Sequence, residues 1–114
     1  PVGEALRRLL ERSDDLERCA SQAAVEDART GIPHGHFRGT RGCNYTAFAE
    51  NEVPGWSLTE YGSVEAVIEE STQLMFEEGP GGGHYENLTD DFDKVGCGIH
   101  VTENGEVWVV QDFR

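Results

Sequence analysis

The chain has 114 residues, of which 37% are hydrophobic and 9% aromatic, as expected for a single folded domain spanning 1–114. Its 22 acidic and 9 basic residues give a formal net charge of −13. That charge repels phosphate backbones and anionic lipid, so it argues against a nucleic-acid-binding protein. No apolar run reaches the ~20 residues of a membrane span. There is no signal peptide in the chain as it stands, and the abrupt start at Pro1 suggests a processed or truncated N-terminus.

Two helices are predicted in the first third of the chain. The apolar spacing over residues 2–12 is helical. Ser13 and the acidic residues after it offer N-cap oxygens for a second helix over 14–30, which Gly31 ends. The apolar face of this second helix is rich in alanine and so allows close packing. It consists of Leu16, Cys19, Ala20, Ala23, Ala24 and Ala28.

Residues 31–62 are predicted to be irregular because glycine and proline recur throughout them. A loop of that length in a small domain is more often functional or disordered. The stretch holds His34, His36 and Glu50, which are three of the residues with useful chemistry.

A third helix and a hairpin are predicted in the second half. Ser63 is the expected N-cap of the helix, which ends before Gly79, and the glycine run 81–83 then leads to His84. Residues 95–101 and 107–113 read as strands around Asn104-Gly105, a two-residue turn with both residues at positive φ. Helices followed by an antiparallel hairpin indicate an α+β fold.

The three cysteines leave the compartment open. Cys19, Cys43 and Cys97 form no CxxC pair, so a zinc knuckle or a thioredoxin-like motif is not indicated. One disulfide with a free thiol fits an extracellular protein, whereas three thiols fit a cytosolic one.

Four side chains are candidates for one shared cleft: His34, Glu50, a glutamate of the third helix, and His84. Two imidazoles and one or two carboxylates can bind zinc or another divalent cation. The same groups can instead hydrogen-bond to one another, with the glutamates fixing the histidine tautomers. No local signature such as HExxH joins them, and His34-x-His36 alone is a weak metal signal.

Four short motifs in order resemble the CAP superfamily, the SCP-like domains of cysteine-rich secretory, antigen 5 and pathogenesis-related proteins. The alanine-rich helix leads to the first, His34-Gly35, and the second is Ala49-Glu50-Asn51. The third, Gly83-His84-Tyr85 followed by Asn87-Leu88, is similar to bacterial members, and Val95-Gly96-Cys97-Gly98 is the fourth. Alanine in place of glycine at position 49 and Gly35 in place of serine are departures from the family pattern.

The resemblance implies an α-β-α sandwich with a small antiparallel sheet and a cleft holding two histidines and two glutamates. On this chain that tetrad is His34, Glu50, Glu70 and His84, with His34 and His84 as metal ligands. The alternates are His36 for the first histidine and Glu78 for the second glutamate.

The resemblance also implies a secreted or cell-surface binding module whose cleft holds a divalent cation such as zinc. Members of the family bind sterols or other lipids, metals and protein partners. Two alternatives stay open. One is a metal-dependent hydrolase, such as a peptidase, with a glutamate as general base. The other is a structural interaction domain in which the tetrad is only a hydrogen-bond network. The oligomeric state is not predicted.

Overall fold

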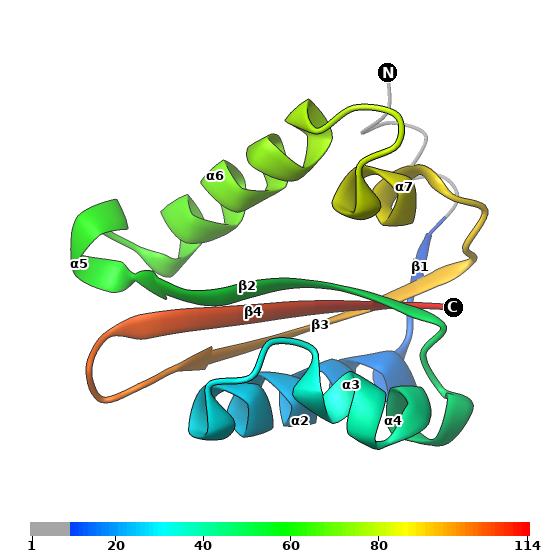
Figure 1. The fold of residues 1–114 in the computed structure, drawn as a ribbon, viewed down its shortest axis with the longest axis horizontal. Coiled ribbons are helices and arrows are strands. Elements are labelled where there is room, and N and C mark those ends of the chain that lie inside the picture. Colours follow the sequence, from blue (N-terminus) through cyan, green and yellow to red (C-terminus); the bar gives the residue numbers. More distant parts are fainter. Residues whose placement is uncertain (1–9) are drawn as a thin grey trace.

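The computed structural model describes residues 10–114 and has three layers (Figure 1). A sheet lies in the middle, with α2, α3 and α4 on one face and α5, α6 and α7 on the other. The helices are α2 (Asp14–Thr30), α3 (Gly35–Gly39), α4 (Arg41–Tyr45), α5 (Leu58–Tyr61), α6 (Val64–Glu77) and α7 (Gly83–Thr89). The strands are β1 (Glu11–Arg12), β2 (Ala49–Ser57), β3 (Lys94–Val101) and β4 (Glu106–Phe113). The predicted α+β sandwich is therefore confirmed.

The sheet is larger than the predicted hairpin and is mixed. Its order is β1-β3-β4-β2, with β1 parallel to β3 and the other pairs antiparallel. Strand β2 lies inside residues 31–62, so the prediction of an irregular stretch there is wrong. The predicted helix over 2–12 is wrong at Glu11–Arg12, which form β1, and residues 1–9 lie outside the described part.

Helix α2 is capped as its sequence predicts. The Ser13 hydroxyl accepts the Leu16 N–H, and Gly31 ends the helix in the left-handed conformation at φ 72°. The alanine face packs on β4 in a buried cluster of Ala20, Ala23, Ala24, Trp108 and Val110.

Two glycines of β3 allow α2 to approach the sheet closely. A Cβ at Gly96 would lie 2.2 Å from the backbone nitrogen of Glu17, and one at Gly98 would lie 2.3 Å from the carbonyl carbon of Ala20. Both distances are shorter than any real contact, so only glycine fits. The height of α2 above the sheet is thus fixed by backbone lying against backbone.

Helix α4 is a left-handed turn held to α2 by a disulfide. Arg41, Gly42, Cys43, Asn44 and Tyr45 all have φ between 54° and 67°, a conformation that costs L-residues roughly 1–2 kcal/mol each. Cys43 is bonded to Cys19 of α2, with 5.9 Å between their Cα atoms. Cys97 is a free, exposed cysteine, so the pairing that the sequence left open is one disulfide and one thiol.

The remaining predicted elements form with small differences. The Ser63 hydroxyl caps α6 by accepting the Ala66 N–H, as expected. At the hairpin only Gly105 has a positive φ, at 77°, and the Thr102 N–H donates to the Glu106 carbonyl. The turn is therefore a three-residue loop with glycine in the left-handed position, and the predicted two-residue turn is wrong.

Replacing Gly98 by alanine tests the close contact between α2 and β3. We expect Gly98→Ala to lower the free energy of unfolding by about 3 kcal/mol or more, because the new methyl group displaces helix backbone. Urea denaturation followed by circular dichroism measures the change. Gly39→Ala is the matched control, since nothing lies within 4 Å of its Cβ position, and its effect should stay within about 1 kcal/mol. Equal stability of the two variants would contradict the contact.

Candidate functional site

One hollow, of about 540 Å³, brings together side chains from distant parts of the chain. The segment after α2, strand β2, the end of α6 and helix α7 all contribute to its walls. Its lining is polar apart from two glycines and consists of His34, Glu50, Asn51, Glu78, Gly82, Gly83, His84 and Asn87.

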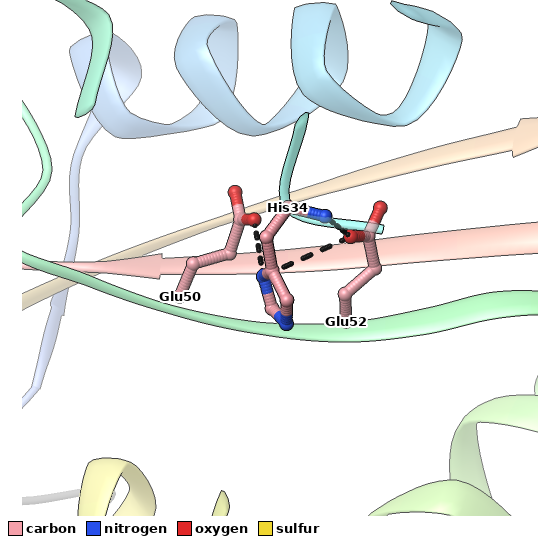
Figure 2. A group of neighbouring side chains, drawn as sticks. All are labelled: His34, Glu50 and Glu52. Carbon is pink, nitrogen blue, oxygen red and sulfur yellow. Dashed lines mark hydrogen bonds and ion pairs between the residues drawn. The ribbon is translucent and has the colours of Figure 1, made fainter. Parts of the chain in front are cut away.

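His34 lies on one wall beside two buried carboxylates. The residue precedes α3 with a left-handed backbone, φ 59°, and its N–H donates to Glu52 Oε1 at 2.6 Å. The ring nitrogen Nδ1 lies 2.7 Å from Glu50 Oε2 and 3.8 Å from Glu52 Oε1. Figure 2 shows the ring beside β2, with both carboxylates on the side of α2.

Strand geometry explains why the two glutamates act together. Residues two apart on a strand point to the same face, so Glu50 and Glu52 both point toward α2, and each side chain is only 1% exposed. His34, Glu50 and Glu52 each offer a ligand atom, and these atoms all lie within 4.8 Å of one another. This buried His/Glu/Glu group could therefore hold a metal ion.

His84 forms the second histidine–carboxylate pair of the hollow. Its Nδ1 lies 2.6 Å from Glu78 Oε2, and its backbone N–H donates to Glu78 Oε1 at 3.0 Å. Glu78 follows α6 directly, so it joins the end of α6 to the start of α7. In both pairs the carboxylate contacts Nδ1 and leaves Nε2 for another partner, the arrangement seen when a carboxylate orients a metal-binding histidine.

A buried asparagine holds α7 on the sheet. The side chain of Asn51 has no exposed surface, and its Nδ2 donates to the His84 carbonyl at 3.3 Å. Its Oδ1 accepts from Asn87 Nδ2 at 2.9 Å, and Asn87 also donates to the Glu50 carbonyl. The position of His84 relative to Glu50 therefore depends on these two amides.

The structure brings some of the predicted residues together and leaves others apart. His34, Glu50 and His84 line the same hollow, and the glutamate beside His84 is Glu78. Glu70, the residue first expected there, is exposed on α6 and does not line the hollow. The helix register places Glu70 about two turns before Glu78.

His36, the alternate for the first histidine, faces a different pocket. It lines a depression with Ile32 and Gly35, and its backbone N–H donates to Asp27 Oδ1 at 2.9 Å. The sequence reasoning missed Glu52, although the alternation Glu50-x-Glu52 within a strand would have placed both carboxylates on one face.

Burial raises the pKa values of three carboxyl groups around His34. Burial raises the pKa of Glu50 to about 7. Burial is also the main cause for Glu52, whose pKa is raised to about 9, and a hydrogen bond to Asp27 is the second cause. The pKa of Asp112 is raised to about 9 by burial and then by its contact with Glu50. Each of these groups therefore binds a proton more tightly in the folded protein than in the unfolded chain.

The pKa of His34 itself is lowered. Burial disfavours its charged form, and the Arg38 guanidinium repels it, while the charges of Asp27 and Asp112 act in the opposite direction. A neutral imidazole keeps a lone pair on one of its two ring nitrogens. His34 is therefore suited to bind a cation.

Taken together, the geometry defines an α-β-α sandwich domain with a polar hollow carrying two histidine–carboxylate pairs. The model of the cysteine-rich secretory protein family, CAP, matches residues 6–113. The chain therefore belongs to the CAP family, as its four motifs suggested.

A solved structure shows the same fold. An outer surface protein from Borrelia burgdorferi superposes with a TM-score of 0.63 at 22% sequence identity, covering 99% of this chain and 86% of that one. No curated protein sequence gives a match.

The raised carboxyl pKa values predict how the stability of the metal-free protein depends on pH. Stabilisation from these groups is fully present below their unfolded values near 4. It is lost as the pH rises through about 7 for Glu50 and about 9 for Glu52 and Asp112. Urea denaturation in chelator at pH 5, 7 and 9 should show a falling free energy of unfolding.

Glu52→Gln should flatten this pH dependence because it removes one buried titrating group. The exposed Glu70→Gln is the control for general charge repulsion and should leave most of the slope in place. If the two variants flatten the slope equally, the buried carboxyl groups are not its source.

Proposed function

We propose that this domain acts by binding and that the polar hollow is its ligand site, occupied in part by a divalent cation. The observation that carries the proposal is the pair of histidines on one hollow, each with its Nδ1 in contact with a carboxylate. His34 is a proposed imidazole ligand, with Glu50 and Glu52 offering carboxylate oxygens to the same cation, and His84 is the second imidazole proposed as a ligand at the hollow. Zinc accepts both kinds of donor.

The lining of the hollow favours a polar ligand. Apart from glycine, every residue that lines it carries an imidazole, a carboxylate or an amide, whereas sites for drug-sized ligands are mostly apolar. A sterol or another lipid would therefore need a different surface of the domain. A cation together with a polar group of a protein partner fits the hollow better.

An extracellular or cell-surface location is part of the proposal. The Cys19–Cys43 disulfide supports it, because structural disulfides persist in oxidising compartments. The similar Borrelia structure is named as an outer surface protein. Among the described residues, no helix is long and apolar enough to cross a membrane.

Isothermal titration with zinc chloride tests the cation site. We expect the purified domain to bind one zinc ion per chain. His34→Ala should weaken binding at least about tenfold, because the ring lies beside both buried carboxylates, and His84→Ala should weaken it as well. His36→Ala is the matched control, since His36 does not line the hollow, and it should bind as the unaltered protein does. Unchanged binding in both the His34 and His84 variants would remove the cation from the proposal.

A further inference from the structure

Two buried aspartates next to the site have no role in the function proposed so far. Asp27 belongs to α2 and Asp112 to β4, and neither residue has any exposed surface. With Glu50 and Glu52 they form a group of four buried acids between α2 and the sheet. We call this group the carboxylate cluster.

The two aspartates lie directly behind the two glutamates. Asp112 is the cross-strand partner of Glu50, and the two carboxyl groups are within hydrogen-bonding reach of each other. Asp27 makes the same kind of contact with Glu52. The cluster therefore consists of two carboxyl–carboxyl pairs, and the glutamate of each pair lies against His34.

Most of the oxygens in the cluster have no hydrogen-bond donor. Asp27 Oδ2, Glu50 Oε1, Glu52 Oε2 and both Asp112 Oδ atoms are buried, and no N–H group or hydroxyl of the described residues donates to them. Among those residues, no lysine or arginine forms an ion pair with any of the four acids.

Such an arrangement is costly in a protein without a bound cation. A buried polar atom left without a partner costs roughly 1–3 kcal/mol, and buried like charges repel one another. Unpartnered buried groups in a native protein call for an explanation, and an ion is one of the usual ones. A cation at the His34 ring would displace the protons that these carboxyl groups hold and balance the negative charge that they then carry.

We propose that Asp27 and Asp112 are positioning residues of the cation site. Asp112 acts through Glu50 and Asp27 acts through Glu52: each lies behind a carboxylate that faces the cation, and it fixes the orientation of that carboxylate. The inference rests on the proposed cation at His34, and it extends the site from the hollow to the α2 face of the sheet.

The proposal predicts opposite effects on stability and on cation affinity. Asn has nearly the shape of Asp, but it carries no charge and its amide can donate to the neighbouring glutamate. Asp112→Asn should therefore raise the melting temperature of the metal-free protein while lowering the affinity for the cation by about 10- to 100-fold. A purely structural residue would lose stability on substitution and leave the affinity unchanged.

The experiment measures both quantities on the same variants. Asp112→Asn and Asp27→Asn are compared with the unaltered protein by thermal unfolding in chelator, and by isothermal titration with zinc chloride and with manganese chloride. In Asp27→Asn the amide oxygen of the new side chain can still accept the His36 N–H, so the loop contact is kept. Asp93→Asn, at a surface position outside the cluster, is the matched control and should change neither quantity appreciably.

Each outcome decides a different point. A higher melting temperature with weakened titration in both buried variants supports the positioning role. If the unaltered protein binds the cation and the two variants bind it equally well, the inference is overturned while the proposed function stands. Absence of binding to the unaltered protein overturns both, and the cluster is then a network of shared protons. A lower melting temperature with unchanged affinity makes the aspartates structural and also overturns the inference.

Discussion

The contact of helix α2 with the backbone of β3 determines where the rest of the site lies. Gly96 and Gly98 leave no Cβ atoms between helix and strand, so α2 lies close to the sheet and brings Asp27 into reach of Glu52. Because Gly31 ends the helix at that height, the chain reverses there and places the N–H of His34 on the Glu52 carboxylate. If α2 were held further from the sheet, the Asp27 carboxylate and the His34 N–H would both move away from Glu52 on β2.

Different interactions hold the two walls of the hollow. The His34 wall belongs to a segment fixed at one end by α2 and at the other by the left-handed turn of α4, which the Cys19–Cys43 disulfide ties back to α2. Within the described residues, no disulfide holds the His84 wall. Its position depends on hydrogen bonds with Glu78 and the buried Asn51. The His84 wall is therefore the more easily displaced, since its contacts are hydrogen bonds and the His84 and Glu78 side chains are partly exposed, at 39% and 33%.

The sequence predicted those parts of the fold that depend on local signals. Helices α2 and α6 follow from their caps and apolar spacing, and β3 and β4 follow from their residue types and the intervening glycine turn. Strand β2 was missed because its buried positions include Glu50, Asn51 and Glu52, so a polarity pattern cannot mark it as a strand. Which glutamate lies beside His84, Glu70 or Glu78, depends on how the end of α6 packs against α7. That packing is a tertiary contact, and the sequence does not show it. The left-handed turn of α4 has no sequence signal beyond Gly42.

The buried acids explain why β2 departs from the usual strand pattern. Edge strands of a sheet often carry charge on their exposed side, but Glu50 and Glu52 point inward and meet Asp112 and Asp27. Apolar residues of similar volume at these positions would often be neutral or stabilising, and the alanine and glycine contacts nearby show that this interface accepts close apolar packing. Functional sites commonly trade stability for activity in this way. The carboxylate cluster therefore lowers stability at a place where the close contact of α2 with β3 can hold the four acids in position. The segment that carries His34 lies beside this cluster, between the end of α2 and the edge of the sheet.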